Sequence, residues 1–163
     1  MGGSRVRIHW RLPSRADAPR QARGLLESAR DLASHPDVLF AAQLITHELV
    51  ANSVRHANLS PAKLIQLVLE FDDDVLFVDV SHPGEGFDAL AALATHYRQA
   101  EPHHGLFLLD TLADRWGFRR GGSRSGVSFE LDLITGRRTW NGREPTRVTE
   151  APPPRASLRR PGL

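Results

Sequence analysis

The stretch that decides the fold runs from residue 36 to residue 57 and reads PDVLFAAQLITHELVANSVRHA. Pro36 is suited to the first turn of a helix, and the apolar residues that follow recur at helical spacing. Glu48 and Asn52 are four residues apart, so they stack on one face of this helix and continue an apolar stripe. The stretch predicts a long, mostly buried helix that carries an acid–amide pair. The alternative is that the pair faces solvent and contacts only Arg55.

Shorter elements surround this helix on both sides. The apolar patterns predict, in chain order, a strand over 6–10, a helix from Ser14 or Asp17 to about 33, the long helix over 37–57, strands over 63–71 and 75–80, a helical stretch around 89–96, a helix over 105–114, and strands near 115–120 and 127–133. The order predicts an α+β two-layer sandwich, in which helices cover one face of a mixed, mostly antiparallel sheet. We expect the other face to be more polar and open to water.

Composition limits the classes of protein to which the chain can belong. Its 163 residues suit one domain, and 40% hydrophobic with 25% charged residues is ordinary for a globular protein. No apolar run approaches the ~18 residues that a membrane span needs, and the N-terminus lacks the apolar segment of a signal peptide. The absence of cysteine excludes disulfides and cysteine nucleophiles. We therefore expect a cytoplasmic protein without a membrane segment.

Positive charge is concentrated at the C-terminal end. Residues 135–163 hold seven arginines and two glutamates, a net charge of +5, so the total of +2 leaves −3 for residues 1–134. The same end holds five of the eleven prolines and few apolar residues. We expect a folded domain over 1–134 and a flexible basic tail rich in proline and arginine over 135–163. Because the domain itself has no basic excess, we expect no direct binding of nucleic acid.

Two further segments have features of ligand-binding loops. Gly84, Gly86 and Phe87 follow a predicted strand, where glycine lets the backbone approach a ligand closely. The segment 103–106, His-His-Gly-Leu, opens a predicted helix, whose free backbone N–H groups favour a phosphate. The alternatives are a plain turn for the first segment and an ordinary helix start after Pro102 for the second.

The order and spacing of these segments resemble a known family. The motifs are Glu48-Leu-Val-Ala-Asn52-Ser-Val-Arg-His56-Ala57, Gly84-Glu-Gly86-Phe87, and Gly105-Leu106 running into Leu112-Ala-Asp114-Arg-Trp116-Gly117. Over about residues 5–133 they resemble the Bergerat ATP-binding fold of gyrase and histidine-kinase ATPase domains. The branch that they resemble most is that of the bacterial anti-sigma factor serine/threonine kinases.

The resemblance implies a role for each matching residue. The amide oxygen of Asn52 would bind Mg²⁺ that bridges the phosphates of ATP, and Glu48 would be the general base toward a serine or threonine hydroxyl. Further positions would contact the nucleotide or line its site: Arg55, His56, His82, Gly84, Gly86, Phe87, His104, Gly105 and Leu106.

Two positions depart from the family pattern. The family has an aspartate two residues before the first glycine of the loop, where it accepts a hydrogen bond from the adenine amino group; this chain has His82. Losing a charge-assisted hydrogen bond costs roughly 1.5–3 kcal/mol. Asp79 is no substitute, because three residues along a strand place it on the opposite face. The lid motif Gly-x-Gly-Leu has lost its first glycine to His103, which predicts a stiffer lid.

Other catalytic motifs are incomplete. His47-Glu48 begins like the helix of a zinc protease, but Ala51 stands where the second histidine is needed. The run from Gly121 to Ser125 lacks the second glycine of a nucleophile elbow.

Two functions therefore remain. The first is an ATP-dependent kinase that binds a sigma factor and phosphorylates its anti-anti-sigma antagonist, which Glu48 and Asn52 favour. The second is a nucleotide-poor partner-switching module without kinase activity on the same fold, which His82 and His103 favour. The resemblance also implies that two copies can pair as a homodimer. A fragment of a larger histidine-kinase-like sensor is less expected, because the chain starts with Met1.

Overall fold

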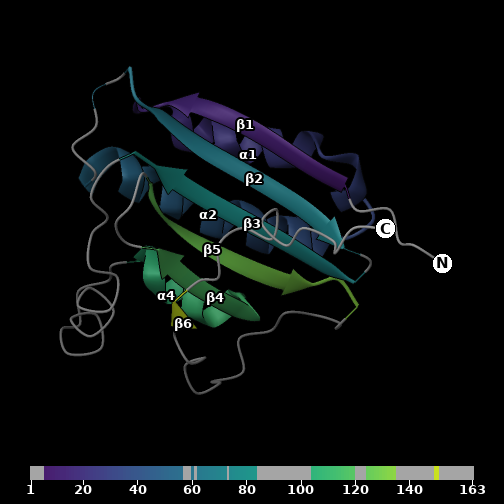
Figure 1. Cartoon of the computed structure of the whole chain (residues 1–163). Coiled ribbons are helices and arrows are strands. Elements are labelled where there is room, and N and C mark those ends of the chain that lie inside the picture. Colours follow the sequence, from purple (N-terminus) through teal and green to yellow (C-terminus); the bar gives the residue numbers. More distant parts are fainter. Residues whose placement is uncertain are drawn as a thin grey trace, which may run out of the picture.

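Helices cover one face of a sheet in the computed structural model of the chain (Figure 1). The structure describes residues 6–56, 60, 62–72, 74–83, 104–119, 124–134 and 149–150. The elements in these ranges are β1 (Val6–Pro13), α1 (Ala18–Ser28), a 3-10 turn (Arg30–Leu32), α2 (Pro36–His56), β2 (Leu64–Asp72), β3 (Val75–His82), α4 (His104–Leu112), β4 (Arg115–Arg119), β5 (Ser125–Asp132) and β6 (Thr149–Glu150). The predicted α+β two-layer architecture is confirmed.

The described strands form one sheet in the order β1-β2-β3-β5-β4-β6. All neighbours are antiparallel except β4 and β6, which are parallel, so the sheet is mixed and mostly antiparallel, as predicted. β5 lies between β3 and β4, and it pairs with β3 from Val75↔Asp132 to His82↔Ser125. The chain thus passes from α4 to β4, which lies beyond β5 in the sheet, before β5 fills the position beside β3.

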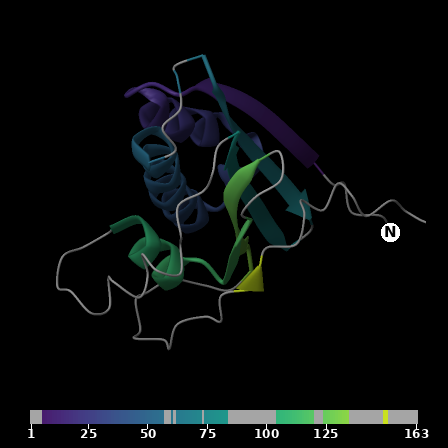
Figure 2. The ribbon, with the colours of Figure 1, turned by 60° about the vertical axis from the view of Figure 1, so that its left-hand side comes forward.

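The core lies between the sheet and the helices. α2 contacts α1 on one flank and α4 on the other (Figure 2). Alternate residues of each strand point into this layer, and the largest fully buried side chains are those of Leu26, Leu32, Ile45, Val50, Ile65, Leu67, Leu69, Leu76, Leu109, Phe129 and Leu131. The apolar residues that alternate along the strands and those that recur at helical spacing in α2 pack together in a single core cluster.

Several predicted boundaries differ from those in the structure. The first helix ends at Ser28 and does not continue to residue 33, because Ala29 is extended (φ −74°, ψ 103°) and the chain resumes as a 3-10 turn that buries Leu32. The side chain of Ser28 competes with backbone N–H groups for a helix carbonyl, because its Oγ donates a hydrogen bond to the carbonyl oxygen of Leu25 at 2.7 Å. The strand predicted over 6–10 continues to Pro13, and the strand predicted over 75–80 continues to His82.

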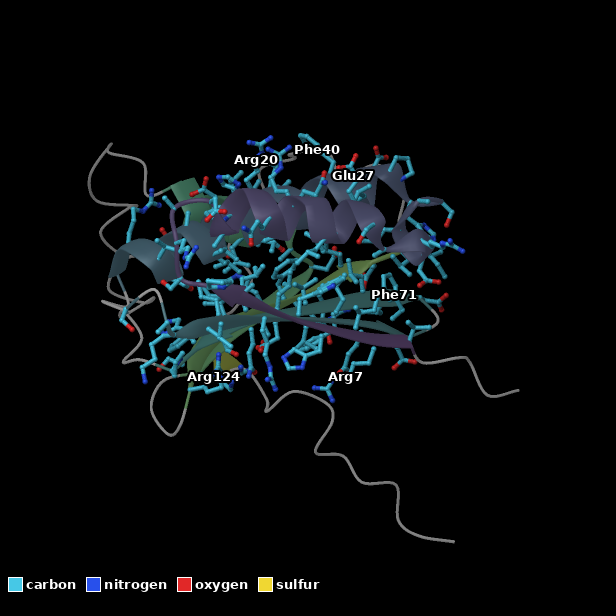
Figure 3. The ribbon with its side chains drawn as sticks, turned by 90° about the horizontal axis from the view of Figure 1, so that it is seen from above. Arg7, Arg20, Glu27, Phe40, Phe71 and Arg124 are labelled. Carbon is cyan, nitrogen blue, oxygen red and sulfur yellow. The ribbon has the colours of Figure 1, made fainter. Side chains whose placement is uncertain are left out.

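The face of the sheet away from the helices is polar, as predicted, but much of it is shielded from water. Figure 3 shows Arg7 and Arg124 projecting on this side, opposite the helices. Glu70 and Asp79 are only 3% and 2% exposed there. Their carboxylates lie 3.2 Å from Nε of Arg7 and 2.7 Å from Nη1 of Arg119, respectively. These pairs are close but poorly aligned as hydrogen bonds. Oppositely charged side chains on different strands thus neutralise each other across this face.

Two expectations concern residues that are largely outside the described ranges. The helical stretch around 89–96 lies outside them, as does most of the tail over 135–163. Within the tail, Thr149 and Glu150 pair with Gly117 and Phe118 of β4. Among the helices that the structure describes, none has the length and apolar character needed to cross a membrane.

Candidate functional site

The acid–amide pair lies on the flank of α2 that faces α4. The opposite flank is marked by Gln43, whose Nε2 donates to the carbonyl of Arg23 in α1 at 3.2 Å. A helix turns by about 100° per residue, so Glu48 and Asn52 lie about 140° and 180° around the helix from Gln43. Both side chains are half-buried. They therefore stand at the border between the core and the side of α2 toward α4.

Asn52 has a cationic partner on its own helix. Nη2 of Arg55 donates to Oδ1 of Asn52 at 2.9 Å, and Arg55 is exposed. The sequence left open whether the pair is inward-facing or merely bound to Arg55. Both descriptions apply in part: Asn52 is half-buried, and its amide oxygen also accepts a hydrogen bond from Arg55. An amide oxygen that attracts a guanidinium group is also a suitable ligand for a hard cation.

His82 is buried at the end of β3, on the face that the helices cover. It follows Val78 and Val80 in the alternation of that strand, both of which belong to the core. The side chain is 5% exposed, and its Nδ1 has no hydrogen-bond partner. Burial, and to a smaller extent the nearby charge of Arg124, lower the pKa of His82 from its ordinary value. The imidazole is therefore neutral at physiological pH, with one polar atom left for a ligand.

Arg124, the residue directly before β5, is hydrogen-bonded to the end of β3. Its Nε donates to Oγ of Ser81 at 3.2 Å, and its Nη2 donates to the carbonyl oxygens of Ser81 and Leu64 at 2.9 and 3.0 Å. Burial lowers the pKa of Arg124, but the group remains charged. Sequence reasoning missed this residue, because nothing in the local pattern indicates that β5 pairs with β3.

Asp79 lies on the other face of the sheet, as the strand alternation predicted. Its register partner in β5 is Ser128, and its carboxylate pairs with Arg119 of β4. It is therefore directed away from the helices and from His82.

The start of α4 is described only through its backbone. His104, Gly105 and Leu106 form the first turn of this helix, and His56 is the last residue of α2. Gly84, Gly86, Phe87 and His103 lie outside the described residues. Further along, a hydrogen bond links α4 to β4: Nε1 of Trp116 in β4 donates to Oδ1 of Asp110 in α4 at 3.2 Å.

These elements end on the same side of the molecule. Figure 1 places the C-terminal end of α2, the end of β3 and the start of α4 at its left-hand edge. Asn52 lies one turn before the end of α2 and His82 is the last residue of β3, so both belong to element ends on this side, and Glu48 lies one turn before Asn52 on the same flank. No group of three or more histidine and acidic side chains suited to a metal occurs in the part of the chain that the structure describes. The carboxylate, the amide and the imidazole can form hydrogen bonds and transfer a proton, and the amide supplies a single hard oxygen ligand.

Comparison with known protein families decides the assignment of this fold. Residues 12–130 match the model of the histidine kinase-like ATPase domain, which is more than half of the chain. The chain belongs to this family. A search of curated proteins finds no match.

Domains of the family bind ATP, typically with Mg²⁺. The residues of this chain fit such a ligand on two counts. The Oδ1 atom of Asn52 already binds a cationic group. Nδ1 of His82, which is buried and unpartnered, is able to meet a further polar atom. An ATP-binding, kinase-like domain is the function that the family assigns.

Proposed function

We propose that the chain is an anti-sigma factor protein serine/threonine kinase, which binds a sigma factor and phosphorylates the anti-anti-sigma antagonist of that factor. The observation that carries the proposal is the half-buried pair of Glu48 and Asn52 on the flank of α2 toward α4, in a member of the histidine kinase-like ATPase family. An acid and an amide one turn apart supply a proton acceptor and a metal ligand at one place.

In this proposal each residue of the chain has a distinct task. Asn52 holds Mg²⁺ through its amide oxygen, and the metal with ATP supplies the activated phosphoryl group. Glu48 accepts the proton of the substrate hydroxyl as that oxygen bonds to the terminal phosphorus, and ADP leaves with the electrons of the broken bond. Arg55, His56 and His82 would hold the nucleotide, and the backbone N–H groups of Gly105 and Leu106, at the start of α4, would favour its phosphates. By the family resemblance, Gly84, Gly86 and Phe87 would also contact the nucleotide.

A second candidate is a partner-switching module without kinase activity. Two observations favour it: His82 stands where the resemblance implies an aspartate, and Arg55 already occupies the amide oxygen of Asn52. Weak nucleotide binding would leave exchange of protein partners as the whole function.

The proposal includes the setting of this activity. The partners are a sigma factor and an anti-anti-sigma protein, with no direct contact to nucleic acid or membrane, and two copies of the chain pair as a homodimer. The protein acts in the cytoplasm, with its ATPase domain over 1–134 and a basic tail over 135–163.

Phosphoryl transfer in a mixture of native partners tests the proposal. The purified chain is incubated with the soluble proteins of its source cells and γ-labelled Mg-ATP, and labelled and retained proteins are identified by mass spectrometry. The kinase predicts label on a serine or threonine of a small protein, lost with Glu48→Gln, together with retention of a sigma factor. Retention without label, equal in wild type and Glu48→Gln, would establish the partner-switching module. Absence of both would contradict the assignment to anti-sigma factors.

A further inference from the structure

β1 is an edge strand, and no described strand pairs with its outer side. It spans Val6–Pro13 and borders only β2 in the sheet. On such a strand, alternate residues direct their backbone N–H and C=O groups away from the sheet. Figure 1 shows β1 at the upper border of the sheet, clear of the other labelled strands. The outer backbone of β1 is thus able to accept one more strand.

The two faces of β1 differ in chemistry. Arg7, His9 and Arg11 alternate along the face away from the helices, and all three are exposed. Val6, Ile8 and Trp10 alternate along the helix-covered face and are only partly buried, although they pack against the core. A further strand would therefore meet basic groups at every second position and incompletely covered apolar groups at the positions between.

Little negative charge balances the basic face. Glu70 pairs with Arg7 at 3.2 Å, whereas Arg11 makes no hydrogen bond or ion pair in the ranges that the structure covers. Slight burial and the charges of Arg11, Arg7 and Arg124 lower the pKa of His9, in agreement with the alternation that places Arg7, His9 and Arg11 on one face. The edge is therefore electropositive over most of its length.

The charges exclude the two occupants that the chain itself offers. In a two-fold antiparallel pairing of β1 with a second copy, side chains on the same face meet, so that His9 facing His9 puts Arg7 opposite Arg11. Like charges directly opposite each other are destabilising. The C-terminal segment 135–163 has a net charge of +5 and is repelled as well. An extended nucleic acid would need a continuous basic surface, but Glu70 and Asp79 lie on the neighbouring strands of the same face.

We propose that the outer edge of β1 binds an extended segment of a partner protein in which acidic and apolar residues alternate. The segment adds a strand to the sheet: its acidic side chains face Arg7, His9 and Arg11, and its apolar side chains cover Val6, Ile8 and Trp10. This surface goes beyond the proposed kinase function, because it needs no nucleotide and lies on a different element from Glu48 and Asn52.

The test uses the full chain and a peptide labelled with fluorescein at its N-terminus, fluoresceinyl-Gly-Glu-Val-Glu-Val-Glu-Val-amide, in low salt without nucleotide. Fluorescence anisotropy is expected to show saturable binding that Arg11→Glu weakens by about tenfold, because an attractive charge pair becomes repulsive. Hydrogen exchange of the amides in 6–12 is expected to slow when the peptide binds. The matched control is Arg20→Glu, an equal charge change on the opposite side of the molecule, in the helical layer (Figure 3), which should change affinity less than about twofold.

Further controls test whether a different ligand occupies the edge of β1. The double variant Arg159→Glu/Arg160→Glu controls for attraction by the tail, and a lysine–valine peptide and a six-nucleotide oligothymidylate control for the chemistry of the ligand. Binding that the tail variant removes, tighter binding of the oligonucleotide, or unchanged exchange in β1 would each overturn the proposal. Absence of saturable binding would overturn it as well.

Discussion

Arg55 donates a hydrogen bond from Nη2 to Oδ1 of Asn52 at 2.9 Å, within the last two turns of α2. The oxygen that the family resemblance implies as a metal ligand is therefore already in contact with a cation that belongs to the chain. Because Arg55 is exposed, the contact is weak and reversible. A divalent cation that arrives with nucleotide competes with this guanidinium group for the same oxygen.

Removal of the competitor should strengthen metal binding. In Arg55→Ala, the affinity for Mn²⁺ at saturating ATP should rise about 1.4- to fivefold, since an exposed pair of this kind contributes about 0.2–1 kcal/mol. Titration of the free Mn²⁺ signal by electron paramagnetic resonance measures the change. Arg23→Ala, on α1, serves as the control. Weaker Mn²⁺ binding in Arg55→Ala would show that Arg55 assists the metal site and does not compete with it.

Loss of the proposed base should separate chemistry from binding. Glu48→Gln keeps the shape of the side chain but cannot accept the hydroxyl proton, so phosphoryl transfer should fall by about a hundredfold or more. ATP affinity should stay within about twofold of the wild type, because the role of Glu48 concerns the acceptor hydroxyl. Label transfer and equilibrium titration measure the two quantities. Undiminished transfer would refute the assignment of Glu48.

His82 should make the stability of the fold depend on pH. Its pKa is lowered in the folded state, so the unfolded chain binds more protons at mildly acidic pH, and the free energy of unfolding falls as pH drops below the ordinary value of 6.5. Urea denaturation of the wild type should show this loss between neutral pH and about pH 5. The loss should be smaller in His82→Gln, whereas replacement of the exposed His9 should matter less. An equal loss in His82→Gln would place the titrating group elsewhere.

Two glycines should respond in opposite ways to alanine. A Cβ atom on Gly126 would lie 2.5 Å from the carbonyl oxygen of Val80 and 2.8 Å from Cβ of Ser81, whereas a Cβ atom on Gly24 meets nothing within 4 Å. Gly126→Ala should lower the free energy of unfolding by about 1–3 kcal/mol. Gly24→Ala, in the exposed side of α1, should raise it by about 0.5–1 kcal/mol. Chemical denaturation checks both, and equal effects would contradict the close approach of β3 and β5.

The parts of the fold that depend on local signals could be predicted from the sequence. Pro36 and the apolar period located α2 to within one residue at each end, and the apolar runs predicted as strands over 63–71 and 75–80 located the turn between β2 and β3. The alternation of β3 also placed Asp79 on the face away from the helices, where it pairs with Arg119. These features follow from the steric and hydrophobic preferences of neighbouring residues alone.

The parts that depend on distant strands could not be predicted. β3 continues to His82 because Ser125 pairs with it from β5, and the local sequence shows only a proline and two glycines after that point. The contacts of Arg124 with Ser81 and Leu64 depend on the same pairing. The early end of α1 reflects the burial of Leu32 by a 3-10 turn, which a helical period does not reveal.

Calorimetric titration with Mg-ATP tests the central claim, that the flank of α2 toward α4 binds nucleotide through Asn52. The wild type should bind with measurable heat and a rise in melting temperature, and Asn52→Ala should lose the dependence on Mg²⁺. Gln43→Ala, which alters an amide on the opposite flank of the same helix, should bind like the wild type. Absence of heat and of a thermal shift at millimolar Mg-ATP, or equal binding by Asn52→Ala and the wild type, would contradict the account.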